Sequence, residues 1–152
     1  MDKEKPYDPG KYWKPSLTTD VVLIAEHEHE NYVLFIRRKN PPYQGSWAFP
    51  GGFLDQGETT RECAVRELEE ETGVSIDKER LRLLLVADDP SRDPRTRVIS
   101  VVFLACGKKS EFILKPGDDA SEAAWFPLEK PPQLAFDHEW ILKQAVNAKN
   151  IS

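Results

Sequence analysis

The sequence has few of the residues that build disulfide frameworks, thiolate metal sites or membrane spans. Its 152 residues include two cysteines, Cys63 and Cys106, and neither has a second Cys or a His at a metal-ligand spacing. Both are therefore expected to be buried free thiols. No apolar run approaches the roughly 18 residues of a membrane helix, and the first residues lack the hydrophobic stretch of a secretory signal. These absences argue against a disulfide-rich scaffold and predict a cytoplasmic protein without a membrane span.

Positive charge is also in short supply. The 21 Lys and Arg residues are outnumbered by 26 Asp and Glu residues, which gives a net charge of -5. Non-specific binding to a polynucleotide needs a basic surface that displaces counterions from the phosphate backbone, so polynucleotide partners are not expected. The hydrophobic content of 39% is high enough for a core, since a chain of about 150 residues buries roughly 70% of its unfolded surface. One ordinary folded domain is predicted.

The chain opens with an irregular segment that is followed by a hairpin. Residues 1–16 carry three prolines and a glycine among charges and aromatics. This composition predicts an irregular N-terminal arm, with the folded domain at 17–150. Two apolar runs rich in β-branched residues, at 21–24 and 32–36, flank a polar turn and predict a β-hairpin.

Strand-forming runs recur later in the chain. A short strand at 46–49 should end at Pro50-Gly51-Gly52, and the strongly apolar runs at 81–86 and 98–105 should be neighbouring strands of one sheet. A last short strand is expected at 123–126. Strands first, a helix in the middle, more strands and a final helix are an α+β order. The predicted architecture is an α/β/α sandwich without regular βαβ alternation.

Two helices are predicted. Residues 59–72 contain no Gly or Pro, Thr59 or Thr60 can cap the start, and Gly73 stands where a left-handed C-terminal residue belongs. The second helix is expected at 137–148. Its four candidate core residues are Trp140, Ile141, Ala145 and Val146.

The middle helix carries an acidic face. Glu67, Glu70 and Glu71 fall on one side of it, at spacings of three and four residues. Like charges at these spacings each cost roughly 0.2 to 0.5 kcal/mol, and anions are disfavoured near the C-terminus of a helix. A solvated acidic face is the ordinary explanation, because Glu is a good helix former. Spacing alone leaves both a solvated face and a cation site open.

The segment around this helix favours the cation site. Residues 52–74 read G, five residues, E, seven residues, R-E-L-x-E-E-x-G-V, and this pattern resembles the Nudix hydrolase box at every defined position. The preceding Trp47-Ala48-Phe49-Pro50-Gly51-Gly52 is similar to the strand and turn that lead into the box in this family. The resemblance covers about residues 18–148. It implies a Nudix hydrolase fold, with a mixed β-sheet between helices.

The residue types of the box suit hydrolysis of a nucleoside diphosphate linkage. Attack of water on phosphorus builds negative charge on phosphate oxygens, which hard divalent cations stabilise. Such cations take oxygen ligands, and Mg²⁺ uses one or two carboxylates together with substrate phosphates and water. An acidic site also needs metal ions if it is to bind an anionic substrate. We therefore expect activity to depend on Mg²⁺ or Mn²⁺.

The resemblance assigns metal ligands to individual residues. Glu70 and Glu71 look like the principal ligands, and the Gly52 carbonyl looks like a backbone ligand. Glu67 looks like either a further ligand or the base that activates water. These four residues form the expected metal set.

Glu58 and Arg66 complete the box part of the expected catalytic set. Arg66 should pair with Glu58 and also with Glu70, which lies four residues along the helix, and so aim the carboxylates. A structural role and a metal role for Glu58 both remain open. Glu62 and Glu69 point away on the helical wheel and should be solvated.

The resemblance leaves the general base open between two places, because members of the family take it from the box helix or from a later loop. Glu67 is the candidate on the helix. A later Gly-Asp-Asp turn resembles the additional acidic loop of the family, and it offers Asp119 as first choice, Glu122 as second, and Asp118. An Asp-Asp pair after Pro-Gly is also common turn chemistry.

Substrate selection lies outside the box. The segment at 90–100, with Arg92, Arg95 and Arg97, resembles the segment after the box in ADP-ribose pyrophosphatases, and 134–139 is similar to the same group. The arginines offer forked donors to a pyrophosphate or a terminal ribose. A charged surface loop between strands is an equally weighted alternative.

Other aromatic and charged residues have less specific interpretations. Three aromatic residues are candidates for stacking on adenine: Tyr43, Trp47 and Phe53. Trp47 is equally suited to the core. The histidines share no ligand spacing and are interpreted as turn and helix-cap residues: His27, His29 and His138. A basic triplet at a strand end is better explained by protection of a sheet edge than by phosphate binding: Arg37, Arg38 and Lys39.

The expected reaction is hydrolysis of ADP-ribose to AMP and ribose 5-phosphate. One alternative is a pyrophosphohydrolase for oxidised nucleoside triphosphates, and another is a non-catalytic, nucleotide-sensing Nudix domain. Regulators in this family carry an extra DNA-binding domain, for which 152 residues leave no room, so an enzyme is preferred. The expected partner is a small nucleotide, with no polynucleotide and no membrane. A homodimer stays open.

Overall fold

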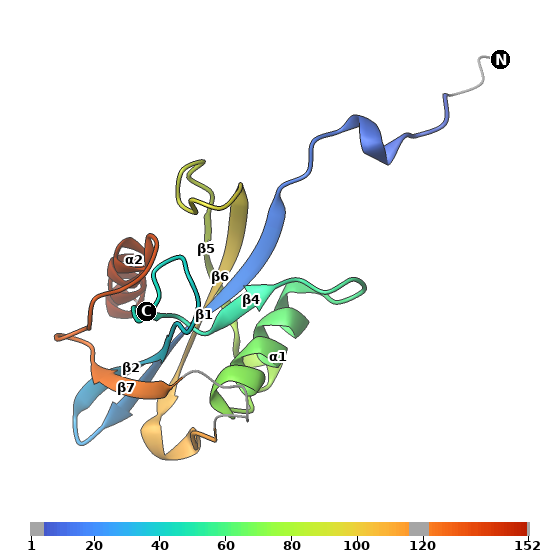
Figure 1. Ribbon diagram of the computed structural model, residues 1–152. Coiled ribbons are helices and arrows are strands. Elements are labelled where there is room, and N and C mark those ends of the chain that lie inside the picture. Colours follow the sequence, from blue (N-terminus) through green and yellow to red (C-terminus); the bar gives the residue numbers. More distant parts are fainter. Residues whose placement is uncertain (1–4, 116–121, 152) are drawn as a thin grey trace.

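The computed structural model describes residues 5–115 and 122–151, and a mixed sheet forms its centre (Figure 1). The described strands make one seven-stranded sheet of order β3-β2-β1-β6-β5, in which β4 also pairs with β1 and β7 with β2. The strands are β1 Ser16–His27, β2 Glu30–Arg37, β3 Trp47–Ala48, β4 Gly51–Phe53, β5 Arg82–Ala87, β6 Val98–Lys108 and β7 Ala123–Pro127. The helices are α1 Thr60–Thr72 and α2 His138–Ile151, with short 3-10 helices at Pro9–Lys11, Lys78–Arg80 and Lys109–Glu111.

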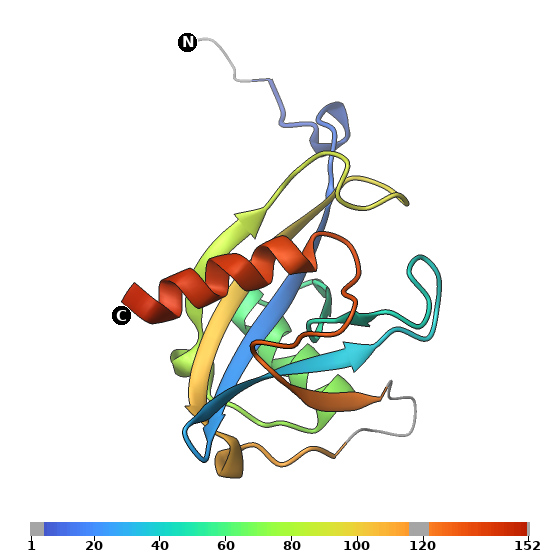
Figure 2. The same cartoon turned by 90° about the vertical axis from the view of Figure 1, so that its left-hand side faces the viewer.

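The helices α1 and α2 cover opposite faces of the sheet. Figure 2 shows α2 lying across one face, with α1 behind the sheet. On β1, Val21 and Leu23 face the core under α1, whereas Val22 and Ile24 face the core under α2. Alternate residues of a strand point to opposite faces, so β1 contributes to both cores. The predicted α/β/α sandwich is confirmed.

The predicted strand pairs are present. β1 and β2 form an antiparallel hairpin with Ile24 opposite Val33, and β5 pairs antiparallel with β6. In addition, β1 runs parallel to β6 from Ser16 to Glu26, so both strands start at the same end of the sheet. That end carries polar residues of the candidate site.

The predicted short strand at 46–49 is β3, which ends before Pro50, but the sequence did not predict that Gly51 and Gly52 start a further strand. Gly51 and Gly52 belong to β4, where they pair antiparallel with Asp20 and Thr19 of β1. A Cβ on Gly51 would overlap the Thr19 carbonyl oxygen, so only glycine allows this close approach. The glycines therefore hold β4 between β1 and α1.

The predicted box helix is confirmed, and its caps are well defined. The Thr59 hydroxyl accepts a hydrogen bond from Glu62 N at 3.1 Å, and the Glu62 carboxylate accepts one from Thr59 N at 3.1 Å. This reciprocal pair is a capping box. Gly73 ends the helix with a φ of 79°, a left-handed conformation that glycine adopts without a steric penalty. Glu62 is exposed, as predicted, and also caps the helix.

Helix α2 buries a different stripe from the predicted one. Ile141 and Ala145 are buried, as expected, and Leu142 joins them. Trp140, however, is 48% exposed, and Val146 is half-buried. At 100° per residue Trp140 lies on the far side of the helix from the buried stripe, so its prediction as a core residue is wrong.

The two cysteines differ in exposure. Cys63 is buried, and its sulfur accepts a hydrogen bond from the Thr19 hydroxyl at 3.2 Å. Burial raises the pKa of the Cys63 thiol to about 11. Cys106 is exposed, so its prediction as a buried thiol is wrong. It lies on β6 beyond Leu104, the last β6 residue that pairs with β5.

Residues 5–15 extend away from the sheet (Figure 1). All of them are exposed, and the rings of Tyr7 and Tyr12 stack on each other with centroids 5.8 Å apart. Strand β1 then begins at Ser16. Within the described ranges, no helix has the length and apolar content needed to cross a bilayer.

Candidate active site

A cavity of about 390 Å³ lies beside α1 and β4. The predicted site residues that line it are Gly52, Phe53, Glu67, Glu71, Arg92 and Arg95. We call Gly52, Glu67 and Glu71 the acidic wall. The basic wall consists of Arg38, Arg92 and Arg95, with Phe136 between Arg38 and Arg95. The cavity thus joins carboxylates from one continuous motif to guanidinium groups from distant parts of the chain.

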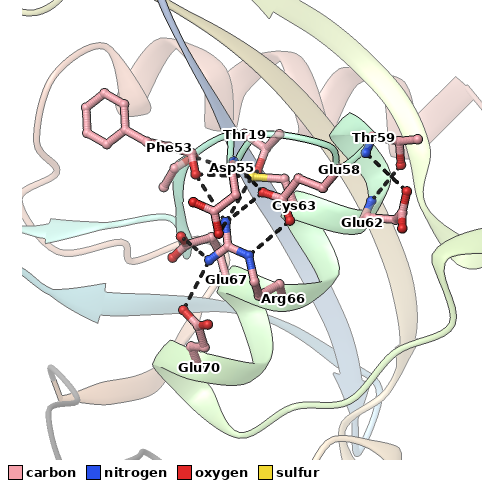
Figure 3. A network of polar contacts seen from close by, with 11 residues as sticks. Thr19, Phe53, Asp55, Glu58, Thr59, Glu62, Cys63, Arg66, Glu67 and Glu70 are labelled. Atoms are coloured by element: carbon pink, nitrogen blue, oxygen red, sulfur yellow. Dashed lines mark hydrogen bonds and ion pairs between the residues drawn. The ribbon is translucent and has the colours of Figure 1, made fainter.

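Arg66 ties the acidic residues of α1 to the loop before it (Figure 3). Its Nε and Nη2 donate to the two oxygens of Glu58 at 3.1 and 2.7 Å, and Nη1 donates to Glu70 Oε2 at 3.3 Å. Both predicted pairs are therefore present. Nη1 also donates to Glu67 Oε1 at 2.8 Å, a contact that the helical wheel did not predict. Arg66 thereby fixes the direction of the Glu67 carboxylate.

Glu58 is held by backbone as well as by Arg66. The Asp55 N–H donates to Glu58 Oε1 at 2.7 Å. The hydrogen bonds from Arg66 and from Asp55 lower the pKa of Glu58 to about 2, so this carboxylate stays ionised. The Phe53 carbonyl also accepts from Arg66 Nη2, at 3.1 Å. These bonds join β4, its following loop and α1 into one unit.

Glu71 is a half-buried carboxylate of the acidic wall. Its Oε1 accepts a hydrogen bond from Gly51 N at 2.7 Å. Burial raises the pKa of Glu71 to about 8, and the charges of Glu67, Asp20 and Glu70 add to the rise. Burial also raises the pKa of Glu67, against the lowering effect of Arg66. A cation held near two half-buried carboxyl groups with raised pKa values favours the ionised form of both.

The donors of the acidic wall fit a hard divalent ion. Among residues 5–115 and 122–151, no group of three or more His, Cys, Asp or Glu side chains is positioned to hold a metal ion. Glu67 and Glu71 supply two carboxylates, and a Cβ on Gly52 would come within 2.5 Å of the Glu67 carboxyl carbon, so the Gly52 backbone borders the same space. One or two carboxylates with water and substrate oxygens is the set that Mg²⁺ prefers.

Several predicted residues do not line the cavity. Glu58, Arg66 and Glu70 act on it through the network described above. Glu122 is exposed, and its carboxylate lies 3.7 Å from Arg37 Nη1. Asp118 and Asp119 lie outside the described residues. Glu67 is therefore the one base candidate that is described and lines the cavity.

The three loop arginines have different surroundings. Arg92 is buried and donates to both oxygens of Asp137, at 2.9 and 2.7 Å. Arg95 donates to both oxygens of Asp93, at 3.1 and 2.8 Å, and its guanidinium lies 5.7 Å from the centre of the Phe53 ring.

Arg97 points elsewhere. Its Nη2 donates to the Asp88 carbonyl at 3.3 Å, its guanidinium lies 5.9 Å from the Trp13 ring centre, and it is not among the residues that line the cavity. Within the described ranges, its buried Nε has no hydrogen-bond partner.

The aromatic candidates separate in the same way. Phe53 lines the cavity and is 47% exposed. Trp47 packs against Phe126, with ring centres 4.8 Å apart, and belongs with the core on the α2 side. Tyr43 contacts Phe136 at 4.9 Å from outside the cavity. Phe53 is the stacking candidate that the structure places at the site.

The edge-protection interpretation is wrong for Arg38. This residue is half-buried and lines the cavity, its guanidinium lies 4.9 Å from the Phe136 ring centre, and its Nε donates to the Pro42 carbonyl at 2.8 Å. Burial and the charge of Arg95 lower the pKa of Arg38. Alternate residues of a strand share a face, so Arg38 should point to the same side as Leu34 and Ile36 of β2. This alternation could have predicted the direction of its side chain.

The helix-cap interpretation is wrong for His138. Its side chain is 3% exposed, lines the cavity, and accepts a hydrogen bond at Nδ1 from Phe49 N at 3.1 Å. Asp20, which sequence reasoning missed, also lines the cavity. A lone aspartate ahead of the apolar run at 21–25 was the available signal, since a charged residue inside a buried strand needs a function or a partner.

Fold and site together define an α/β/α domain that presents buried carboxylates and arginines to one polar cavity. A model of the NUDIX domain family matches residues 14–146. The chain therefore belongs to the NUDIX domain family, as its box predicted. Nudix hydrolases generally need divalent metal ions, which agrees with the donor set of the acidic wall.

Relatives include enzymes and a regulator. The chain is 47% identical over 139 residues to an ADP-ribose pyrophosphatase of Methanocaldococcus jannaschii, covering 91% of this chain and 78% of the relative. It is 32% identical to an ADPR responsive transcriptional repressor of Acinetobacter baylyi, covering 91% of this chain but 56% of the repressor.

Solved structures show the same fold. The NUDIX domain of Shewanella oneidensis NrtR, in complex with ADP ribose, superimposes with a TM-score of 0.82 at 31% identity, covering 94% of each chain. A MutT/nudix family protein of Enterococcus faecalis gives a TM-score of 0.84 at 35% identity, covering 99% of this chain and 66% of the other.

Proposed function

We propose that this protein hydrolyses the pyrophosphate bond of ADP-ribose and releases AMP and ribose 5-phosphate. The observation that carries the proposal is the cavity, in which Glu67 and Glu71 face the same space as Arg95 and Phe53. The similarity to an ADP-ribose pyrophosphatase over 91% of the chain and to an ADP ribose complex supports this substrate.

Four residues would hold Mg²⁺ or Mn²⁺: Gly52 through its carbonyl, and Glu67, Glu70 and Glu71 through their carboxylates. A bound divalent ion would neutralise phosphate charge and lower the pKa of a water nucleophile. Gly51 N fixes Glu71, and Arg66 fixes Glu67 and Glu70. Arg66 and Glu58 therefore act as positioning residues in this proposal.

Glu67 is the proposed base, with Asp119 as the alternative from the later loop. Its carboxylate borders the cavity and its raised pKa makes it a better proton acceptor than an exposed glutamate. Arg66 would aim this carboxylate at the attacking water. The pair Arg95 and Phe53 would hold the remainder of the nucleotide, through a charged contact and a stacking face.

The test is product analysis. Purified protein with Mg²⁺ and ADP-ribose should yield AMP and ribose 5-phosphate in equal amounts, and a chelator should stop the reaction. Release of pyrophosphate from 8-oxo-dGTP at a higher efficiency would favour the triphosphate alternative. The similarity to a repressor favours one further candidate, a sensor domain, which predicts tight ADP-ribose binding without turnover.

A cytoplasmic location, the domain limits at 17–150 and a homodimer remain predictions. We expect no polynucleotide partner, because the net charge is -5 and the cavity is small. Within the proposal, the substrate is a small nucleotide that binds between the acidic and the basic wall.

A further inference from the structure

Asp20 and His138 form a buried polar pair that the proposed chemistry does not use. Asp20 comes from β1 and is 8% exposed, and His138 begins α2 and is 3% exposed. Both line the same cavity as the acidic wall. Buried polar groups are normally hydrogen-bonded, so the partners of each atom indicate what is left for a ligand.

The imidazole of His138 has one free donor. Phe49 N–H donates to Nδ1 at 3.1 Å, so Nδ1 is the acceptor and carries no proton. Burial lowers the pKa of His138, and the neutral ring then carries its proton on Nε2. Asp20 Oδ2 lies 3.9 Å from Nε2, which is too far for a hydrogen bond.

Asp20 is a fixed acceptor. The Ser100 hydroxyl donates to Asp20 Oδ2 from the neighbouring strand β6, and this bond sets the orientation of the carboxylate. The positive charges of Arg38 and Arg92 act on the same region. A carboxylate that is held by a hydroxyl and balanced by nearby arginines retains lone pairs for one more donor.

A donor and an acceptor 3.9 Å apart match one particular ligand group. An oxygen about 2.8 Å from each can bridge them, provided that it both accepts from Nε2–H and donates to the carboxylate. A water molecule or the hydroxyl of a ligand that displaces it does both, whereas a phosphate oxygen would be repelled by Asp20, and an ether oxygen has no proton to donate. The pair is therefore complementary to a sugar hydroxyl.

We propose that Asp20 and His138 bind one ribose hydroxyl of the substrate and select against nucleotides that lack it. This inference rests on the proposed function, because it takes ADP-ribose as the ligand. It assigns specificity to residues outside the box and outside the loop at 90–100. One hydroxyl that satisfies two buried groups should contribute about 10- to 100-fold in affinity.

Two substitutions of His138 separate the Nε2–H donor from the hydrogen bond that Nδ1 accepts from Phe49 N. His138→Asn places an amide oxygen near the position of Nδ1, so Phe49 N–H keeps an acceptor while the Nε2–H donor is lost. His138→Gln keeps a donor near Nε2 and loses the acceptor for Phe49. For His138→Asn we expect KM for ADP-ribose to rise about 10- to 100-fold with kcat changed less than about threefold. His138→Gln should show the smaller rise in KM and the larger loss of thermal stability.

The decisive readout is a set of ADP-ribose analogues, each lacking one ribose hydroxyl. Wild-type protein should lose about 10- to 100-fold on one analogue, and on that analogue His138→Asn should match wild type. On the other analogues the variant should keep its full defect. The exposed neighbour Glu139, whose ion pair with Lys143 spans 3.9 Å, gives the control variant Glu139→Gln, which should behave as wild type throughout.

Equal losses for His138→Asn on every analogue would overturn the proposal and leave a purely structural role, as would a variant with unchanged KM. Binding of the same analogues is measured by calorimetry in parallel. If wild type binds ADP-ribose and discriminates among the analogues but does not cleave it, the proposed enzyme fails while this subsite stands. If all analogues bind and react equally, the subsite fails while the enzyme stands.

Discussion

The acidic wall and the basic wall of the cavity differ in how their charges are balanced. On the basic wall, Arg92 and Arg95 are each paired with an aspartate through two hydrogen bonds. On the acidic wall, Glu71 is half-buried, and among the described residues the Gly51 backbone N–H is its one hydrogen-bond donor. Arg92 and Arg95 are thus preorganised without a ligand, whereas in our proposal the acidic wall is complete only with a cation. Changes to the acidic wall should alter kcat, and changes to the basic wall should alter KM.

The largest expected effect is on two proposed metal ligands, Glu71 in the acidic wall and Glu70 beside it on α1. Glu70→Gln and Glu71→Gln should each lower kcat by at least about 100-fold while the protein stays folded, because a metal ligand is neutralised with its shape retained. Steady-state kinetics with saturating metal measure this loss. Glu69→Gln is the matched control, since Glu69 is exposed, and it should be nearly silent. Near-normal rates for Glu70→Gln and Glu71→Gln would contradict their assignment as metal ligands.

The pH dependence of stability sharpens the same comparison. The native state holds the Glu71 proton more tightly than the unfolded chain, since the pKa rises from 4.5 to about 8. Its contribution to metal-free stability is full below about pH 4.5 and is lost as the pH rises through about 8. Relative to Glu71→Gln, the wild type should lose of the order of 3 kcal/mol over this range.

Denaturant titrations at a series of pH values, with a chelator present, measure this difference. Saturating Mg²⁺ should restore wild-type stability at pH 8, because metal binds the native state only. If wild type and Glu71→Gln lose stability in parallel between pH 5 and 8, ionisation of Glu71 does not determine how the stability of the metal-free protein depends on pH. That result would contradict this account of the acidic wall.

The basic wall should respond through KM. Arg95→Ala should lower kcat/KM on ADP-ribose by about ten- to a hundredfold, as expected for one charge-assisted contact. Arg95→Lys should recover only part, because an ammonium lacks the forked geometry of guanidinium. Arg97→Ala is the matched control, since Arg97 does not line the cavity. A loss confined to kcat, or an equal loss for Arg97→Ala, would contradict the division between the walls.

The smallest expected effect concerns the N-terminal cap of α1, the helix that carries Glu67 and Glu71. Thr59→Ala removes the N-cap of α1 and should lower stability by about 1 kcal/mol, with kcat in saturating metal within about twofold of wild type. Thr60→Ala, one residue later, should cost a few tenths of a kcal/mol at most, because Thr59 makes the cap bond. Thermal melts of both variants check the difference. Equal losses would mean that the capping box does not stabilise α1.

The acidic wall was predictable because it is local. Gly52, Glu67 and Glu71 lie within 20 residues of one another, and helical geometry fixes how they point. Their burial was not predictable, since it depends on β4 packing between β1 and α1, and β4 itself was missed. Two adjacent glycines favour a turn by local propensity, while here they allow a strand to approach β1 too closely for any side chain.

The basic wall was predictable only in part because it is assembled from distant segments. Arg38 and Arg95 of this wall, and His138 beside it, come from three parts of the chain that line one cavity. Arg95 was predicted from a family resemblance, with Arg92 and Arg97 as alternatives, and Arg97 does not line the cavity. Strand register decides between such neighbours, and the sequence carries no local signal for it. His138 needed knowledge of its contact with Phe49, 89 residues away.

The central claim is that the acidic wall and the basic wall together cleave ADP-ribose with the help of a divalent ion. The most direct measurement compares kcat/KM for ADP-ribose and for 8-oxo-dGTP at saturating Mg²⁺ and again with a chelator. We expect ADP-ribose to be preferred by at least about tenfold, and both activities to vanish without metal. A tenfold preference for 8-oxo-dGTP, or turnover that persists in the chelator, would contradict the account.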